Sequence, residues 1–180
     1  MLIPHSLIQG LGGYAYHCPD MIGGGEYMSF KEKEGRLDEE LVVRYAQAAA
    51  LCPMMQFSAA PWRVLSQENM EIVKKAAQLH CRFGNYICTL AEEAAHSGEP
   101  IMRHMAYEYP EQGFETVNDQ FMLGSKILAA PVLVKGQRSR KVKLPEGRWK
   151  GADGVIYEGG HTITIDAPLE QLPWFEAVTD

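Results

Sequence analysis

Hydrophobic residues recur every three or four positions before Pro100 and at alternate positions after it. The longest helical pattern covers residues 67–97, with its apolar stripe at Ile72, Val73, Ala76, His80, Phe83, Ile87, Leu90 and Ala94. A stripe of that length must be covered by a sheet or by other helices. The sequence therefore predicts an α/β part followed by a β part.

The limits of the helices are marked by residues suited to helix ends. For the long helix, Ser66 is the expected N-cap, Gly98 the expected C-terminal residue, and Gly84 a weak point in the middle. A second helix is predicted over residues 37–51, where Asp38 is the expected N-cap. Its expected apolar positions are Leu41, Tyr45 and Ala48.

Short apolar runs at residues 13–18 and 51–58 read as strands on either side of this helix, an order typical of parallel α/β units. After residue 100, alternation between turn signals predicts antiparallel strands joined by short hairpins. The turn signals are Pro145-Glu146-Gly147, Asp153-Gly154 and Gly159-Gly160. Two strands and two helices are too few to bury the long stripe, so we expect the chain to be the tail of a larger fold.

Composition excludes several classes of protein. The 180 residues carry a net charge of -6 and are 46% hydrophobic, so neither a nucleic-acid partner nor a membrane is expected. The start of the chain does not have the pattern of a signal peptide. Four cysteines without paired spacing predict free buried thiols, and hence a cytoplasmic protein with no structural zinc. They are Cys18, Cys52, Cys81 and Cys88.

One loop concentrates glycine beside an acidic side chain. The stretch "HCPDMIGGGE" places Asp20 before three consecutive glycines, which suits either a tight turn or a close approach of backbone to a ligand. A phosphate cradle at Gly23–Gly25 is a weak alternative, because the Lys and Ser/Thr of a P-loop are missing.

Five ordered blocks together resemble glycoside hydrolase family 31, which contains α-glucosidases and α-xylosidases. They are "GLGGYAYHCPDMIGGG", "LVVRYAQAAALCPMMQFS", "GEPIMRHMAYEYP", "DQFMLGSKILAAPVLVKG" and "LPEGRW", and they span most of the chain. The resemblance implies the last strands and helices of a (β/α)8 barrel over residues 1–99. It implies an incomplete antiparallel β-sandwich domain over residues 100–180.

The resemblance also implies a substrate-binding set and the absence of a catalytic pair. Asp20 matches an aspartate at the floor of the family's sugar pocket, and Ser58 stands where the family commonly has a sugar-binding His. Gln56 and Trp62 are further candidates, the latter as an aromatic platform or as a packing residue. The family's nucleophile and acid/base are aspartates on earlier barrel strands, so we assign no catalytic residue, metal or cofactor to this chain.

Two functions remain open from the sequence. The first is a C-terminal fragment of a retaining α-glycosidase, inactive alone, whose partners are an α-linked oligosaccharide or glycoside and either the rest of the glycosidase chain or a second copy. The alternative is a stand-alone carbohydrate-binding or interaction module. Its binding face would use Trp149, Tyr157 and Trp174, provided that these rings are exposed and coplanar.

Overall fold

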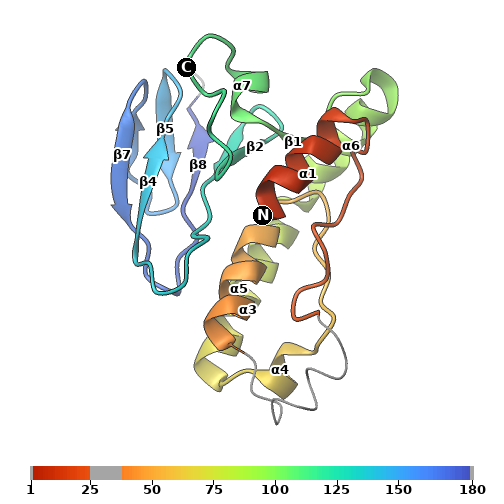
Figure 1. Cartoon of the computed structure of the whole chain (residues 1–180), viewed down its shortest axis with the longest axis vertical. Helices are drawn as coiled ribbons and strands as arrows, with labels where there is room; N and C mark the ends of the chain where they lie inside the picture. The colour runs from red at the N-terminus through yellow and green to blue at the C-terminus, as the bar shows by residue number, and fades with distance from the viewer. Residues whose placement is uncertain (1, 25–37, 179–180) are drawn as a thin grey trace.

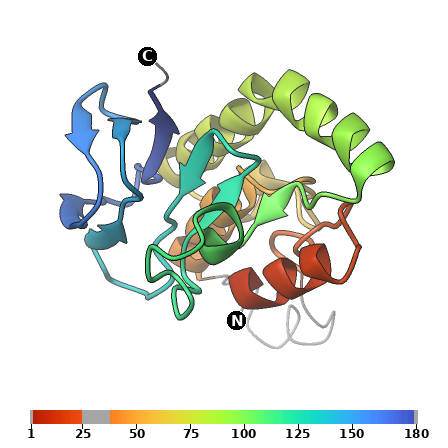
Figure 2. The same ribbon diagram turned by 90° about the horizontal axis from the view of Figure 1, so that it is seen from above.

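The computed structural model describes residues 2–24 and 38–178. A six-stranded antiparallel sheet lies between a group of helices and a smaller two-stranded sheet, as Figures 1 and 2 show. The part before residue 100 was predicted as α/β and is mainly helical in the structure. The β part predicted after residue 100 is confirmed.

The helices have the ends that the sequence predicts. The side chain of Asp38 accepts a hydrogen bond from the Leu41 amide at 3.3 Å, Ser66 does the same for Asn69 at 3.4 Å, and Gly98 ends its helix with a φ of 78°. The described helices are α1 (Leu2–Leu11), α3 (Glu39–Ala49), α4 (Pro61–Val64), α5 (Gln67–Arg82), α6 (Gly84–Ser97) and α7 (Met105–Glu108).

The long predicted helix is divided at its weak point. Helix α5 ends at Arg82 and α6 begins at Gly84, while Phe83 between them departs from helical dihedral angles, with φ −91° and ψ 5°, although its amide still donates to the Leu79 carbonyl and its carbonyl accepts from Ile87. The apolar stripe continues across the break, since Ile72, Val73, Ala76, Phe83, Ile87, Leu90 and Ala94 are all buried. His80 is half-buried and its Nδ1 lies 3.1 Å from the Ala50 carbonyl, as expected for a hydrogen-bonded core histidine.

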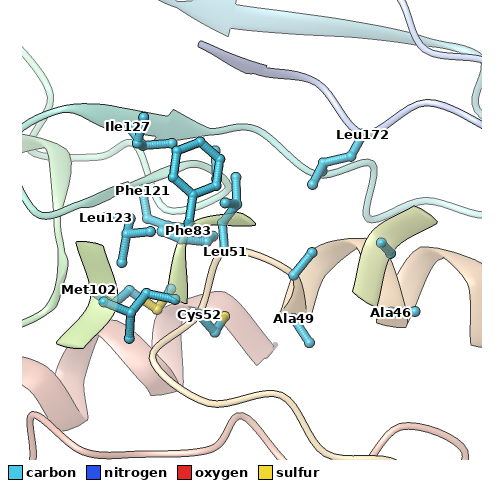
Figure 3. Packing of buried hydrophobic residues seen from close by; sticks show 14 of the residues in the cluster. Ala46, Ala49, Leu51, Cys52, Phe83, Met102, Phe121, Leu123, Ile127 and Leu172 are labelled. Carbon is cyan, nitrogen blue, oxygen red and sulfur yellow. The ribbon is translucent and has the colours of Figure 1, made fainter. Parts of the chain in front are cut away.

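The large sheet has the order β1-β2-β3-β8-β5-β6, and the small sheet pairs β4 with β7. In the central strands of the large sheet, alternate residues belong to two different hydrophobic cores. Phe121, Leu123 and Ile127 pack against the helices (Figure 3), whereas Met122, Leu128 and Phe175 face the small sheet. The strands are β1 (Met102–Arg103), β2 (Phe121–Leu123), β3 (Ile127–Ala129), β4 (Ser139–Lys143), β5 (Arg148–Gly151), β6 (Ile156–Glu158), β7 (Thr162–Asp166) and β8 (Trp174–Ala177).

Two of the three predicted hairpins are in fact crossovers between the sheets. Asp153-Gly154 does join the paired strands β5 and β6, but the turns at residues 145–147 and 159–160 carry the chain from one sheet to the other. These two turns pack together through backbone hydrogen bonds, including Gly159 N to Gly147 O at 2.7 Å. A Cβ on Gly159 would lie 1.7 Å from the Pro145 carbonyl oxygen, so the sandwich requires glycine there.

The two predicted parallel strands are wrong as regular strands. Residues 13–18 and 51–58 contain no regular strand, and a single parallel bridge joins Phe57, in the second run, to Ile22, four residues after the end of the first. A parallel strand needs hydrogen-bonding neighbours, which the second run finds at one point and the first run at none among the described residues. Pro53 removes a further donor from the second segment.

Other departures concern burial and unpredicted elements. Leu41 is 64% exposed, because helix α3 buries the face that carries Val43 and Ala46 instead. Cys52 is buried, but Cys81 and Cys88 are exposed, so the expectation of buried thiols holds for only part of the set. Three helices without a sequence prediction are present, α1 and the one-turn helices α4 and α7.

A buried arginine joins the helical part to the β part. The Arg44 guanidinium on α3 donates to three backbone carbonyls, at 2.8 Å to Ala167, 3.1 Å to Gln137 and 3.3 Å to Gln171, and also to the Gln47 side chain. Burial lowers the pKa of Arg44. Within the described ranges, no helix has the length and apolar character needed to cross a membrane.

Candidate functional site

Asp20 lies in an irregular segment after α1, with its side chain exposed. Its φ is 103°, a conformation that residues other than glycine rarely adopt, and its Oδ1 accepts a hydrogen bond from the next amide, Met21, at 2.7 Å. A non-glycine residue held at such a φ is strained, and strain of this kind is concentrated at functional sites. The backbone therefore fixes the direction of this carboxylate.

The segment after Asp20 lies beside the segment that carries the other candidates. The Ile22 amide donates to the Gln56 carbonyl at 2.8 Å, and the Ser58 amide donates to the Ile22 carbonyl at 2.9 Å. Ile22 is fully buried, while the side chains of Gln56 and Ser58 are exposed. The segment that follows Asp20 and the segment that carries Gln56 and Ser58 are about 36 residues apart in sequence, and they thus lie side by side in the structure.

A cavity of about 1030 Å³ opens at Asp20, between α1, α3 and the segment that follows β3. Asp20 lines it, but Gln56, Ser58 and Trp62 do not. Trp62 lies on the one-turn helix α4 and is 73% exposed, so packing under the loop does not explain this residue. The structure accordingly joins Gln56 and Ser58 to Ile22, two residues after Asp20, and leaves Trp62 apart from the cavity.

Tyr45, on helix α3, stabilises the loop that carries Asp20. Its hydroxyl donates to the Pro19 carbonyl at 3.1 Å, and the side chain lines the same cavity. Burial, with a smaller effect from the charge of Asp20, raises the pKa of Tyr45 to about 12. The hydroxyl therefore remains a donor at neutral pH. The sequence marked Tyr45 only as part of a helical apolar face, and no local signal distinguishes its second role.

His17, three residues before Asp20, is buried and neutral. Its Nδ1 faces the Tyr14 carbonyl at 3.0 Å and so acts as the donor, and burial lowers the pKa of the ring. The other nitrogen, Nε2, is buried and finds no partner among the described atoms. The ring stabilises the loop through one hydrogen bond.

The three acids at the start of α3 are committed to structural contacts. Asp38 pairs with Lys135, Glu39 accepts from Ser66 and Asn69, and Glu40 pairs with Arg138 at 2.6 Å. In each case these hydrogen bonds lower the pKa of the carboxyl group. None of the three holds a proton for general acid catalysis at neutral pH.

The glycines after Asp20 build a turn. Gly23 has a φ of 74°, and a Cβ on Gly24 would lie 2.9 Å from the Met21 carbonyl oxygen. The phosphate cradle considered for Gly23–Gly25 extends to Gly25, which lies outside the described residues. Across residues 2–24 and 38–178, no group of three or more His, Cys, Asp or Glu side chains has the geometry to hold a metal ion.

The three aromatic residues of the β part do not form one exposed face. Trp149 is 2% exposed and its indole donates to the Pro145 carbonyl at 2.9 Å, so it belongs to the core. Tyr157 and Trp174 are half-buried. A coplanar platform made of all three rings is therefore excluded.

Comparison with known proteins gives a consistent picture. Residues 98–176 match the family model of the glycosyl hydrolase family 31 C-terminal domain. The chain is 33% identical to the myogenesis-regulating glycosidase of Mus musculus over 97% of its own length and 25% of that protein. It is 30% identical to alpha-glucosidase 2 of Bacillus thermoamyloliquefaciens over 97% of its length and 22% of that protein.

Solved structures agree with these relatives. A GH31 alpha-xylosidase from a soil metagenome, complexed with xylose, superposes with a TM-score of 0.83 at 28% identity, covering 97% of this chain and 29% of that one. A GH31 dextranase of Flavobacterium johnsoniae, complexed with isomaltotriose, gives 0.82 at 31% identity, covering 97% and 22%. The chain spans about a quarter of the length of the curated relatives named above.

Proposed function

Because the chain belongs to glycoside hydrolase family 31 and corresponds to the C-terminal portion of its relatives, we propose that it forms one wall of the sugar pocket of a retaining α-glycosidase. The proposed substrate is an α-linked oligosaccharide or glycoside. The relatives named for glucosidase and dextranase activity, and the neighbour complexed with isomaltotriose, support this class of ligand.

The observation that carries the proposal is the parallel bridge between Ile22 and Phe57. Adjacent parallel strands are the repeating unit of a (β/α)8 barrel, and barrel enzymes bind substrate at the carboxyl ends of the strands. We propose that residues 1–99 supply the last strands and helices of such a barrel, and residues 100–180 a β-sandwich domain behind it. Ser58 follows the bridge on its carboxyl side, whereas Asp20 lies two residues before Ile22, on the amino side of the bridge.

Each proposed pocket residue has groups suited to a sugar. The carboxylate of Asp20 accepts hydrogen bonds from hydroxyl groups, while Ser58 and Gln56 both donate and accept. The exposed ring of Trp62 offers a face for the apolar side of a pyranose. Ser58 is shorter and uncharged compared with the family's His, so the proposal leaves the identity of the sugar to experiment.

The bond-breaking groups are proposed to lie outside this chain. A retaining glycosidase needs two carboxyl groups about 5 Å apart, one as nucleophile and one as acid/base. Of the other acids that line the cavity at Asp20, Asp38 and Glu40 are used in a cap and in ion pairs, and Asp119 pairs with Arg140 at 2.8 Å. We therefore assign pocket-forming residues and no catalytic residue. The free cysteines support the further proposal of a reducing, cytoplasmic location.

Turnover of aryl α-glycosides tests this function. The chain should be inactive alone, and activity should appear when it is joined to the barrel segment that precedes the matching region in alpha-glucosidase 2. Asp20→Asn should then lower kcat/KM by about a hundredfold, since a hydrogen bond to a charged group contributes about 3 kcal/mol. Turnover by the chain alone, abolished by the same substitution, would overturn the proposal.

A further inference from the structure

Contacts on both sides of its Cα atom hold Asp20 in its unusual backbone conformation. Two rotations, φ and ψ, set the orientation of the peptide plane before a residue relative to the plane after it. The plane before Asp20 carries the Pro19 carbonyl, and the plane after it carries the Asp20 carbonyl and the Met21 amide. A residue other than glycine keeps a φ of 103° only while its surroundings fix both planes.

A side chain of helix α3 fixes the plane before Asp20. The Tyr45 hydroxyl donates to the Pro19 carbonyl at 3.1 Å, although 26 residues of sequence separate the two. The helix supports this donor, because the flanking residues Arg44 and Ala46 are buried and the Tyr45 ring packs against the core of the helical part. The pKa of about 12 keeps the proton on the phenol at neutral pH, so the bond persists there.

The plane after Asp20 is fixed by the loop itself and by the segment beside it. The Met21 amide donates to Asp20 Oδ1 at 2.7 Å, and the Cys18 thiol donates to the Asp20 carbonyl at 3.6 Å. One residue farther along, the Ile22 amide donates to the Gln56 carbonyl at 2.8 Å and anchors the chain. These contacts act on the later plane, whereas the phenol acts on the earlier one.

We propose that Tyr45 is the positioning residue of Asp20: the phenol holds the peptide plane before Asp20, keeps φ positive and so fixes the direction of the carboxylate in the cavity that both residues line. This inference rests on the proposed function, in which the carboxylate accepts hydrogen bonds from a sugar. Tyr45→Phe keeps the ring and removes the tether. The backbone of Asp20 then relaxes toward a negative φ, and the carboxylate changes direction.

The chain contains a matched control for this substitution. Tyr16 lies in the same segment as Asp20, four residues earlier, and its hydroxyl also donates to a backbone carbonyl, that of Ala91, at 2.8 Å. Tyr16 does not line the cavity. Tyr16→Phe therefore removes the same kind of hydrogen bond and leaves the tether on the Pro19 carbonyl in place.

Urea denaturation of the full chain tests the tether. Glycine adopts a positive φ without strain and alanine does not, so the folding equilibrium constant of Asp20→Gly should exceed that of Asp20→Ala. With Tyr45→Phe present, this ratio should fall at least about threefold, because the strain that separates the two residues is relieved. With Tyr16→Phe present, it should be unchanged. A ratio that keeps its value with Tyr45→Phe, or that falls equally with both substitutions, would overturn the proposal.

Turnover by the chain joined to the preceding barrel segment gives a second measurement. Tyr45→Phe should lower kcat/KM about tenfold, divided between kcat and KM in the same proportion as the loss caused by Asp20→Asn. It should cause no further loss when Asp20→Asn is present, and Tyr16→Phe should leave kcat/KM unchanged. Additive losses would overturn the proposal. If Asp20→Asn itself leaves turnover unchanged, the proposed function fails instead, and the stability ratio still decides whether Tyr45 sets the conformation of Asp20.

Discussion

The backbone at Asp20 joins a strained conformation to a carboxylate that the proposed sugar pocket needs. With a φ of 103°, the backbone conformation of Asp20 carries a free-energy cost that glycine at the same position would not have. Asp20→Gly and Asp20→Ala both remove the carboxylate, so their difference isolates the backbone. We expect the glycine variant to have the higher free energy of unfolding, by about 1 kcal/mol, in urea denaturation. Equal stabilities would show that the conformation is unstrained.

Arg44 is the residue on which the junction between helices and strands most depends. Its guanidinium donates to the Ala167, Gln137 and Gln171 carbonyls; in Arg44→Met the Ala167 and Gln171 carbonyls lose this donor, whereas Gln137 keeps a bond from Arg138. We expect a loss of about 3 kcal/mol in the free energy of unfolding, measured by urea denaturation. Arg138→Met is the control, because the Arg138 side chain is 47% exposed and its ion pair with Glu40 should contribute much less.

At the scale of the elements, helix ends were predictable because their signals are local. Asp38, Ser66 and Gly98 act within one turn of their own positions, and the break at Gly84 follows from its low helix propensity. The strands at residues 13–18 and 51–58 were not predictable, because a strand exists only where a neighbour offers hydrogen bonds. Asp20 was singled out by a motif, whereas the cavity that it lines forms only when α1, α3 and the segment after β3 meet.

Two glycines in different elements should respond in opposite directions to alanine. Gly159→Ala places a Cβ 1.7 Å from the Pro145 carbonyl oxygen and forces the crossover turns apart, which we expect to cost about 3 kcal/mol. Gly84→Ala meets no atom within 4 Å and should stabilise the start of α6 by up to about 1 kcal/mol. Thermal melts of both variants measure the contrast. A stable Gly159→Ala variant would mean that the two turns do not pack as described.

The junction between α3 and α5 should weaken in acid. Hydrogen bonds from Ser66 and Asn69 hold the pKa of Glu39 below its ordinary value of 4.5 in the folded chain. Because the folded pKa is the lower one, the contribution of Glu39 is complete above pH 4.5 and is lost as the pH falls through the folded pKa. In Glu39→Gln, the free energy of unfolding should change less between about pH 5 and pH 3 than it does in the unmodified chain, as measured by urea denaturation at each pH. An unchanged slope would assign the acid sensitivity to other groups.

At the scale of the whole molecule, the helical part and the β part share one hydrophobic core. The cluster that contains Val43 and Ile72 also contains Phe121 and Ile127, so residues before and after position 100 are buried against each other (Figure 3). Helix α3 adds the polar junction of Arg44. We infer that the two proposed domains unfold together in a single transition, although one is proposed to belong to a barrel wall and the other to a sandwich.

The surface around the large cavity should decide how the isolated chain behaves in solution. Leu41 and Val134 are each 64% exposed, and Leu133 is 48% exposed. All three line that cavity and together form an apolar rim that is exposed to water. If the rest of a glycosidase normally packs there, the chain alone should self-associate through this rim. Sedimentation velocity of the unmodified chain should show a dimer or a larger species.

Substitution at the rim separates this cause of association from others. Leu41→Glu combined with Val134→Glu should restore a monomer, because the loss of two buried apolar contacts costs about 3 kcal/mol, or more than a hundredfold in Kd. Val155→Glu provides the control, since Val155 is 51% exposed in the β5–β6 hairpin and does not line the cavity. If the unmodified chain is a monomer that unfolds cooperatively, the rim does not need another chain to cover it. That result would weaken the proposal that further residues complete the pocket at Asp20.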